Sequence, residues 1–373
     1  MVRVLHIVTN MDRGGLETML MNYYRHMDRE KIQFDFLEHR RDRAAYDDEI
    51  ESLGGRIFRL PRLNPLSSGY FHALNAFFAA HPEYRIVHSH LDCMSAYPLC
   101  AAKNAKVPVR IAHAHSTSQD RNWKLAFKLI SKKMIAFYAT DLFACSVSAG
   151  KWMFGTSNVR ILPNAIDVNL YTFSPSVREQ MRKELGVENR LVIGHVGRFS
   201  AVKNHMFLLD VFVSLLKKEP NAVLLLVGGG EDMPKIQAKA HALGIAEYVR
   251  FLGVRSDVAD LMQAMDVFVF PSLYEGLPVT MIEAQASGLP CIISDGVPRD
   301  CVITDLVQQI DLNDDLSAWA EKAIAAAKLQ RKDTHEVVCS AGFDIYKAAE
   351  HLERYYEQLE VRKSAYGKKD VFR

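Results

Sequence analysis

The sequence predicts an α/β protein with two doubly wound domains, each built on a parallel sheet covered by helices on both faces. Short and almost continuously apolar runs alternate with helical stretches along most of the 373 residues. Such runs are typical of parallel strands, because these strands are buried on both faces. The chain is too long for one ordinary core, and the runs fall into two sets, so two domains are expected.

The two sets of expected strands divide the chain in the middle. Those of the first half lie at residues 3–9, 34–37, 57–60, 86–90, 109–113, 142–146 and 159–162. Those of the second half lie at residues 191–196, 222–227, 249–252, 267–270 and 290–293. Between the sets, turn residues surround one short charged helix at 177–185, so the boundary falls in that region. We therefore predict a first domain over residues 1–168 and a second over residues 169–344.

Composition and net charge limit the classes of protein to consider. Hydrophobic residues make up 49% and charged residues 24%, as in ordinary soluble domains. The net charge of +2 gives no sign of a nucleic-acid partner, and none is expected. No apolar run reaches the roughly 18 residues of a membrane span, the N-terminus opens directly on a strand, and the six cysteines contain no C-x-x-C pair. We expect a cytoplasmic protein, in which any contact with the inner face of the cell membrane is peripheral.

Residues 121–138 have the pattern of an amphipathic helix with a basic stripe. The apolar residues at helical spacing are Trp123, Phe127, Ile130, Met134 and Phe137. The basic residues four apart are Lys124, Lys128 and Lys132, with Arg121 and Lys133 nearby. Such a surface suits peripheral contact with an anionic membrane, and it suits equally a domain helix whose lysines face solvent. The net charge of residues 1–170, +6 against −4 for the rest, favours an anionic surface or acceptor on the first-half side.

The most specific local pattern is a strand, a turn and a helix start over residues 267–284. Glu275 lies in the turn, and Glu283 lies eight positions on, in about the second turn of the expected helix. Pro278 fits the first helical turn, where its missing N–H costs nothing, and the free N–H groups after it can face phosphate. Carboxylates placed like this can accept hydrogen bonds from the two sets of vicinal hydroxyls of a nucleotide sugar. The alternative is a surface loop with one capping acid.

Glycines and cations follow other expected strands. Gly14 and Gly15 precede a helix, where free N–H groups and the helix dipole favour an anion, although the G-x-G-x-x-G dinucleotide pattern is absent. Arg198 follows strand 191–196, and Lys203 comes five residues later. Together they could neutralise a diphosphate, the guanidinium by forking two oxygens and the ammonium as a point charge. The alternative is two solvated surface cations.

Four histidines end two of the expected strands, His88 and His90 on one and His113 and His115 on the other. A histidine at a strand end is more often structural than catalytic. The His-x-His spacing puts both rings on one face of a strand, as a metal site would require. No carboxylate or cysteine nearby completes such a site, and the sequence has no Asp-x-Asp pair, so no metal is expected.

Together these motifs resemble the retaining nucleotide-sugar glycosyltransferases of the GT-B fold that carry a Glu-x7-Glu motif. Many members of that family build capsular polysaccharide or exopolysaccharide in bacteria. The resemblance covers nearly the whole chain and is strongest over residues 161–167 and 192–298. It implies two Rossmann-like domains facing across a cleft. It also implies a last helix at 345–361, within the terminal segment 345–373, that packs back onto the first domain.

The resemblance implies roles for individual residues. Arg198 and Lys203 would hold the donor diphosphate, and Glu283 would bind the ribose hydroxyls. Glu275 would hold the transferred sugar near its C3 and C4 hydroxyls, and His115, whose neighbour His113 is the other candidate, would be the active-site histidine beside it. The remaining donor contacts would come from Gly14 and Gly15 in the first glycine loop, Gly253 and Val254 beside the base, and the backbone of Leu277, Pro278 and Val279.

The activity implied is transfer of a sugar from a nucleotide-diphosphate sugar, by default a UDP-sugar, with retained anomeric configuration and without a metal or other cofactor. The acceptor would be a free or lipid-linked saccharide. Two alternatives stay open, namely a sugar-nucleotide epimerase of the same architecture and a non-catalytic sugar-nucleotide-binding partner of another transferase. The intact set of two acids and two cations argues against the second alternative.

Overall fold

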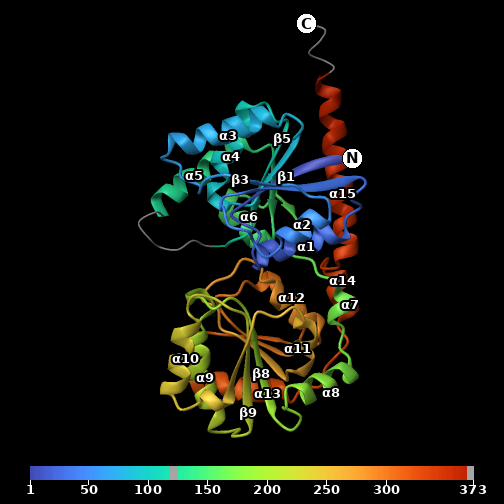
Figure 1. The fold of residues 1–373 in the computed structure, drawn as a ribbon. Coiled ribbons are helices and arrows are strands. Elements are labelled where there is room, and N and C mark those ends of the chain that lie inside the picture. Colours follow the sequence, from blue (N-terminus) through green and yellow to red (C-terminus); the bar gives the residue numbers. More distant parts are fainter. Residues whose placement is uncertain (118–124, 368–373) are drawn as a thin grey trace. The chain divides into compact units, whose positions relative to one another are not determined.

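The computed structural model describes residues 1–117 and 125–367, which form two compact units (Figure 1). Unit 1 consists of residues 1–165 and the terminal segment that begins at Ile345. Unit 2 consists of residues 166–344. The division predicted after residue 168 lies close to the first of these two crossing points. Each unit has its own parallel sheet and its own hydrophobic core, so the predicted fold class is confirmed.

The sheet of unit 1 has seven parallel strands in the order β3-β2-β1-β4-β5-β6-β7. They are β1 (Val2–Val8), β2 (Ile32–Glu38), β3 (Ile57–Arg59), β4 (Ile86–Ser89), β5 (Val109–Ala114), β6 (Asp141–Ala144) and β7 (Arg160–Ile161). In the register of the central pairs, Val4 of β1 lies opposite Phe34 of β2 and Ile86 of β4. These side chains are fully buried, as near-continuous apolar strands predict.

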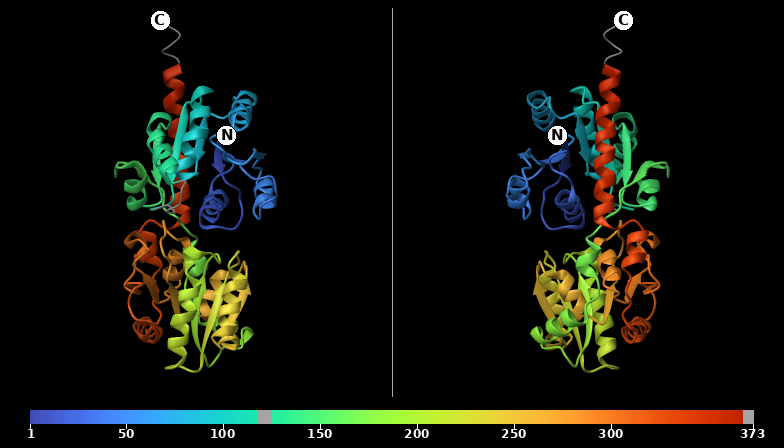
Figure 2. Two further views of the ribbon diagram at one scale, coloured as in Figure 1. Left: turned by 90° about the vertical axis from the view of Figure 1, so that its left-hand side faces the viewer. Right: turned by 90° about the vertical axis from the view of Figure 1, so that its right-hand side faces the viewer.

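Helices cover both faces of this sheet. They are α1 (Gly15–His26), α2 (Asp47–Ser52), α3 (Ser68–Ala80), α4 (Ala96–Asn104), α5 (Leu125–Tyr138), α6 (Val147–Phe154) and α15 (Ile345–Gly367), with the 3-10 turn η1 (Asp92–Ser95). The terminal helix α15 packs against α1, β1 and β2 (Figure 2). Its buried residues, among them Ile345, Leu352 and Tyr356, recur at helical spacing and join the core of unit 1.

The sheet of unit 2 has six parallel strands in the order β10-β9-β8-β11-β12-β13. They are β8 (Leu191–Val196), β9 (Ala222–Val227), β10 (Val249–Gly253), β11 (Val267–Phe270), β12 (Cys291–Ser294) and β13 (Val307–Ile310). Strand β13 was not predicted. It lies at the sheet edge and carries two glutamines, so it lacks the apolar run of a central strand. Gln309 of β13 donates to the Ser294 and Val297 carbonyls, which anchors the strand through its side chain.

The helices of unit 2 are α7 (Val168–Tyr171), α8 (Pro175–Glu184), α9 (His205–Leu216), α10 (Met233–Ala242), α11 (Val258–Ala264), α12 (Val279–Ala286), α13 (Leu316–Ala327) and α14 (His335–Ser340). Three 3-10 turns, η2 (Ala201–Lys203), η3 (Ala246–Tyr248) and η4 (Arg299–Cys301), complete it. Local signals explain several helix starts. Ser174 caps α8 by accepting a hydrogen bond from the Val177 N–H, and Pro175 occupies its first turn.

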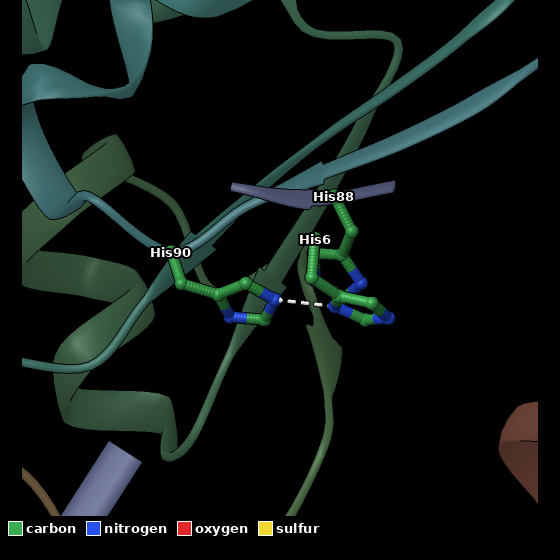
Figure 3. Close-up of side chains that lie close together, drawn as sticks. All are labelled: His6, His88 and His90. Carbon is green, nitrogen blue, oxygen red and sulfur yellow. Dashed lines mark hydrogen bonds between the residues drawn. The ribbon is translucent and has the colours of Figure 1, made fainter. Parts of the chain in front are cut away.

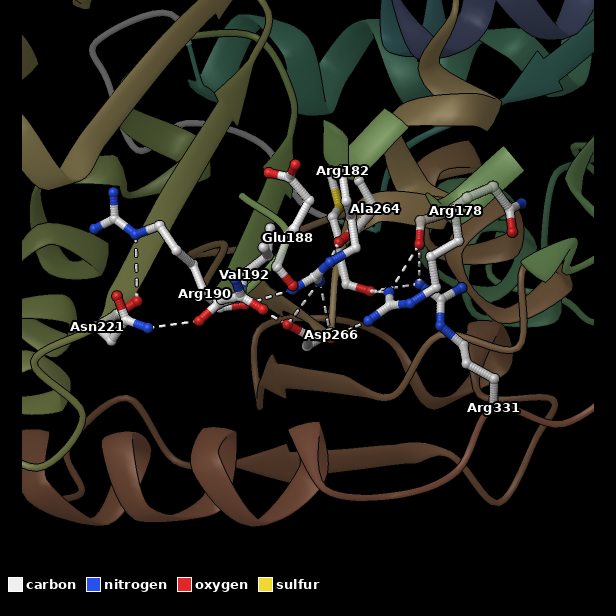
Figure 4. A network of polar contacts seen from close by, with 12 residues as sticks. Arg178, Arg182, Glu188, Arg190, Val192, Asn221, Ala264, Asp266 and Arg331 are labelled. Atoms are coloured by element: carbon white, nitrogen blue, oxygen red, sulfur yellow. Dashed lines mark hydrogen bonds and ion pairs between the residues drawn. The ribbon is translucent and has the colours of Figure 1, made fainter. Parts of the chain in front are cut away.

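A polar network fixes the end of α11 next to the start of β11 (Figure 4). The carboxylate of Asp266 accepts from Arg178 at 2.5 Å, from Arg182 at 3.2 Å and from the Val192 N–H at 2.7 Å. Arg331 and both other arginines also donate to carbonyls at the end of α11. These cations supply the acceptors of a helix C-terminus with donors and favour its dipole, so the network is a structural clamp.

Both strand orders reverse direction inside the sheet, between β1 and β4 in unit 1 and between β8 and β11 in unit 2. In open parallel sheets, ligands bind outside the carboxyl ends of the strands at such a switch point. A ligand site is therefore expected among the loops that follow these four strands. Within the described part of the chain, no helix has the length and apolarity that crossing a bilayer requires.

Candidate functional site

In unit 2, three loops lie against one another at the carboxyl edge of β8, β9 and β10. The Gly197 N–H donates to the Val227 carbonyl at 3.0 Å, and the Phe199 N–H donates to the Gly229 carbonyl at 2.8 Å. The Gly228 N–H donates to the Gly253 carbonyl at 2.8 Å. The turn that carries Arg198 is thus hydrogen-bonded to the glycine loop after β9.

Two glycines make this close packing feasible. Gly228 has φ 137°, and a Cβ there would lie 2.1 Å from the Gly197 carbonyl oxygen. Gly230 has φ 157°, and a Cβ there would lie 2.3 Å from the Phe199 carbonyl oxygen. Both contacts are with backbone, which cannot move aside. Glycine is therefore required at both positions.

The turn between β11 and α12 carries the first of the two acids, and neighbouring loops hold it on both sides. The Leu273 N–H donates to the Val202 carbonyl at 2.8 Å, and the Ser294 hydroxyl donates to the Ser272 carbonyl. Helix α12 begins at Val279, with Pro278 as its N-cap in extended conformation at ψ 121°. The prediction that Pro278 lies in the first helical turn is therefore wrong, because its backbone still belongs to the turn. The first N–H groups of α12 nevertheless lack intrahelical acceptors, as at any helix N-terminus.

Glu275 and Lys203, which the sequence placed in separate roles, form one ion pair. The Lys203 Nζ lies 2.7 Å from the Glu275 Oε1, and both side chains are largely buried. The same ammonium lies 4.5 Å from the centre of the Phe270 ring. Arg198 differs, because it is exposed and no hydrogen bond or ion pair joins it to another described residue. Of the two predicted diphosphate cations, one is held in place and the other is unengaged.

Glu283 lies on α12 with only 7% of its surface exposed. The Tyr171 hydroxyl donates to its Oε1 at 2.8 Å. Burial raises the pKa of Glu283 to about 7, while the hydrogen bond from Tyr171 acts in the opposite direction. Tyr171 was missed from the sequence, since a tyrosine 112 positions from its partner gives no spacing signal.

The remaining predicted donor residues of unit 2 lie around the same edge. Gly253 ends β10 with φ 69°, and Val254 after it is 57% exposed. Leu277, Pro278 and Val279 are buried, and the predicted contact of their backbone with a ligand stays a prediction. An exposed apolar side chain at this edge could contact a flat base, and the role given to Gly253 and Val254 stays a prediction.

The predicted residues of unit 1 lie at the carboxyl edge of its own sheet. Gly14 is the N-cap of α1 and Gly15 its first residue, and the Gly14 carbonyl accepts from the Thr18 N–H at 2.8 Å. His115 directly follows β5 and is partly exposed, whereas His113 is buried inside the sheet. The difference in exposure favours His115 over His113 as the histidine available to a ligand.

The histidines that end β4 and β5 are joined by one that the sequence did not single out, His6 of β1. Two groups of three have ring nitrogens within 4.8 Å of one another, and they are His6, His88 and His90 (Figure 3) and His90, His113 and His115. The expectation of no metal rested on missing carboxylates and cysteines. The five rings could supply nitrogens without them, and the register of three adjacent strands is what brings them together.

Residues 177–339 match the family described as glycosyl transferases group 1, and residues 13–170 match glycosyltransferase family 4. The putative glycosyltransferase EpsF of Bacillus subtilis (strain 168) is 41% identical over 358 residues, covering 92% of this chain and 93% of EpsF. The chain belongs to the group 1 glycosyltransferases. The predicted membership of the GT-B glycosyltransferases is thereby confirmed, whereas retention of configuration stays a prediction.

This glycosyltransferase has further relatives of named activity. A UDP-Gal:alpha-D-GlcNAc-diphosphoundecaprenol alpha-1,3-galactosyltransferase of Escherichia coli is 26% identical, with 75% of this chain and 77% of that protein covered. CapH of Staphylococcus aureus, a capsular polysaccharide biosynthesis glycosyltransferase, is 25% identical, with 95% and 99% covered. The crystal structure of Anabaena HepE with UDP and glucose superposes with a TM-score of 0.78 at 19% identity, covering 96% of this chain and 100% of HepE, which supports the GT-B fold.

Proposed function

We propose that the protein transfers a sugar, with retained anomeric configuration, from a nucleotide-diphosphate sugar to a saccharide acceptor in polysaccharide biosynthesis. The observation that carries the proposal is the set of groups at the carboxyl edge of the unit 2 sheet. There, an anchored Lys203–Glu275 pair, an unengaged Arg198 and a buried Glu283 accompany glycine loops and a helix N-terminus. In a glycosyltransferase, such a set can hold the diphosphate and bind the hydroxyl groups of a nucleotide sugar.

The cations have a direct task in this reaction. Cleavage of the bond between sugar and phosphate leaves negative charge on the departing diphosphate. Lys203 is already fixed by Glu275, and Arg198 is free to fork two phosphate oxygens. Charge placed before the reaction stabilises the transition state without reorganisation, which a helix N-terminus reinforces. Because two protein cations serve this purpose, the proposed reaction is independent of a metal and of any other cofactor.

The two acids would bind hydroxyl groups of the nucleotide sugar. Glu283 would accept hydrogen bonds from the ribose hydroxyls, and Glu275 would hold the transferred sugar near C3 and C4. Retaining glycosidases use one of two carboxylates as a nucleophile. Glu275 is paired with Lys203 at 2.7 Å, which suits a binding and orienting group better than an attacking one. In the proposed reaction the departing phosphate takes the acceptor proton on the same face of the sugar.

Donor and acceptor are inferred from relatives. HepE was crystallised with UDP and with UDP-glucose, and the Escherichia coli relative is named for UDP-galactose and a diphosphoundecaprenol-linked sugar. A UDP-sugar donor and a lipid-linked saccharide acceptor are therefore proposed here, with a free saccharide as the second choice. The acceptor side would be unit 1, where His115 would lie beside the transferred sugar and the Gly14–Gly15 loop would contribute donor contacts.

A lipid-linked acceptor implies work at the inner face of the cell membrane, and α5 offers a surface for it. Ile130 is 61% and Phe137 72% exposed, and Leu129, Lys132 and Lys133 border a small hollow with Ile130. Apolar side chains beside lysines suit an anionic bilayer surface. The start of the predicted helix, residues 121–124 with Trp123, lies outside the described residues. We propose peripheral contact of a cytoplasmic enzyme through this helix.

Thermal-shift measurements against UDP-, GDP- and ADP-sugars test the donor. We expect the melting temperature to rise with one nucleotide class and the rise to vanish in Glu283→Ala. A radiolabelled donor then separates transfer from epimerisation, because transfer requires an acceptor and epimerisation does not. A shift with no nucleotide sugar would contradict the proposal, and conversion of the donor without acceptor would favour the epimerase.

A further inference from the structure

Five imidazole rings at the carboxyl edge of the unit 1 sheet form two separate hydrogen-bonded chains. In the first chain, the His6 Nδ1 lies 2.9 Å from the His90 Nε2, and the His90 Nδ1 lies 3.0 Å from the His115 Nε2. Figure 3 shows the rings of His6 and His90 meeting nitrogen to nitrogen. The chain therefore runs from a ring buried in the core to His115, its partly exposed end.

The second hydrogen-bonded chain contains the other two rings, His88 and His113. The Tyr356 hydroxyl of α15 lies 2.7 Å from the His88 Nδ1, and the His88 Nε2 lies 3.1 Å from the His113 Nδ1. No nitrogen of this chain is bonded to His115. The first chain is therefore the one whose hydrogen bonds reach His115, the ring expected beside the substrate.

Each ring of the first chain carries one proton. Burial lowers the pKa of His6 and of His115 to about 3 and lowers that of His90 well below its ordinary value, so all three are neutral. Three rings with one proton each and two hydrogen bonds between them allow only two arrangements. Either every bond is donated from His6 toward His115, which leaves the last proton on the His115 Nδ1, or every bond is donated the other way, which leaves it on the His6 Nε2.

The buried end decides between the two arrangements. The His6 Nε2 is buried and has no hydrogen-bond partner among the described residues. The Phe34 ring lies beside it, with 4.0 Å between ring centres. A proton on that nitrogen would be a buried N–H without an acceptor, which is rarer in proteins than a buried acceptor without a donor. The favoured arrangement puts the proton on the His115 Nδ1.

We propose that His90 and His6 are positioning residues that fix the ring orientation and tautomer of His115, so that His115 offers its Nδ1–H as a hydrogen-bond donor to a substrate oxygen. This inference rests on the proposed function. The backbone of His115 is held as well, since its N–H donates to the Asp92 Oδ1 at 2.8 Å and Asp92 adopts a left-handed φ of 46°. Because the chain ends at a buried nitrogen, it orients His115 and supplies no replacement proton.

The ring planes argue against a metal in the same place. The planes of His6 and His90 differ by 22°, and those of His88 and His90 differ by 24° with ring centres 4.3 Å apart. In the first chain the facing nitrogens already share protons, so their lone pairs point at the neighbouring ring. A zinc site instead needs three lone pairs aimed at one centre about 2.0–2.1 Å away.

A matched pair of variants tests the chain through turnover. In His90→Asn the amide takes the place of Nδ1 and keeps the contact with His115, whereas in His90→Gln it takes the place of Nε2 and keeps only the contact with His6. We expect kcat to fall up to about 100-fold in His90→Gln, with a several-fold fall in His90→Asn and a donor KM that changes little in either. Equal losses in both variants, matched by equal losses of stability, would reduce His90 to a structural residue and overturn the proposal.

Nitrogen-15 NMR of the histidine side chains tests the tautomer without requiring turnover, with the His115 signals assigned from His115→Asn. We expect the Nδ1–H form in the full-length protein and a mixture of forms in His90→Gln. A wild-type His115 with its proton on Nε2 would contradict the inference, and so would stoichiometric zinc in the purified protein that His6→Gln abolishes. If the protein transfers no sugar, the proposed function fails, whereas the NMR result still decides the tautomer.

Discussion

The Tyr171 hydroxyl donates to the Glu283 Oε1 at 2.8 Å, which links the short helix after the domain crossing to the acid proposed to bind ribose. Glu283 is buried, and its ionised form is needed to accept hydrogen bonds from two hydroxyls at once. Tyr171 supplies a donor that favours this ionised form. The hydrogen bond from Tyr171 therefore favours the charge state of Glu283 that is able to bind a donor nucleotide.

The first prediction concerns pH. Since burial raises the pKa of Glu283 to about 7, donor affinity should rise with pH through about 7 and fall on acidification, as the carboxylate gains a proton. Tyr171→Phe removes the stabilising donor, so the midpoint should move to higher pH and the donor Kd at pH 7 should increase several-fold. Titration of donor binding between pH 5.5 and 8.5 measures both effects. A Tyr171→Phe midpoint below that of the wild type would refute the coupling, and Glu283→Gln, which cannot ionise, is the control that should show no midpoint.

The second prediction concerns stability. An acid whose pKa is raised in the folded state stabilises the fold fully below its unfolded value, and this contribution is lost as pH rises through the folded value near 7. Glu283→Gln keeps an acceptor for Tyr171 and removes the buried charge. We expect it to increase the free energy of unfolding at pH 8 by about 3 kcal/mol, since the pKa of Glu283 rises from 4.5 to about 7 and one pKa unit corresponds to about 1.4 kcal/mol. Urea unfolding at pH 5 and pH 8 checks this, and a gain that is larger at pH 5 would have the wrong sign.

The third prediction separates the two cations. Arg198→Ala and Lys203→Ala should each lower kcat by roughly 100-fold to 1,000-fold, because each removes charge from the departing diphosphate. Their effects on stability should differ. Arg198 is exposed and unengaged, so its loss should change the free energy of unfolding by less than about 0.5 kcal/mol, whereas loss of Lys203 removes the partner of Glu275 and should cost about 1–3 kcal/mol. Near-normal turnover in both variants would remove the charge-neutralisation argument.

The fourth prediction concerns the glycine loop after β9. Gly228→Ala should destabilise unit 2 by more than about 2 kcal/mol, because the new Cβ would meet the Gly197 carbonyl oxygen at 2.1 Å at a positive φ. Gly229→Ala is the matched control, since its Cβ would meet only the Val254 side chain, at 3.1 Å. Thermal unfolding of both variants gives the comparison. Equal melting temperatures would show that the loop is looser than its contacts imply.

The fifth prediction concerns α5. We expect the protein to sediment with vesicles that contain anionic lipid, less so at high salt, and to remain in the supernatant with neutral vesicles. Ile130→Ser with Phe137→Ser, both exposed positions, should weaken the binding without altering the folded state. Turnover with a soluble acceptor should then be retained. Equal sedimentation with neutral and anionic vesicles, or none with either, would leave α5 as an ordinary domain helix.

Much of the fold could be predicted from the sequence, because buried parallel strands are recognisable there as apolar runs. The strand Val267–Phe270 appears with its predicted bounds, and Leu191–Val196 does as well. The edge strand Val307–Ile310 could not be found in this way, since it lacks an apolar run and its Gln309 side chain makes hydrogen bonds that only the folded chain reveals. Apolar patterning detects burial, and an edge strand is only half buried.

The candidate site was predictable in its local motifs and not in its long-range contacts. The turn with Glu275 and the helix with Glu283 follow from residues close together in the chain. The contact between Lys203 and Glu275 spans 72 positions, and the contact between Tyr171 and Glu283 spans 112. The position of His6 beside His90 likewise depends on which strands are neighbours in the sheet. Sequence spacing carries no information about such contacts.

We propose that the carboxyl edge of unit 2 binds a nucleotide-diphosphate sugar with protein cations in place of a divalent ion. Calorimetric titration of the protein with the nucleotide sugar selected by thermal shift, in excess EDTA, tests it most directly. We predict one binding site whose affinity is unchanged by EDTA and is weakened at least about tenfold, or 1.4 kcal/mol, in Arg198→Ala and in Glu283→Ala. Binding that disappears with EDTA and returns with a divalent cation, or that neither substitution weakens, would contradict the account.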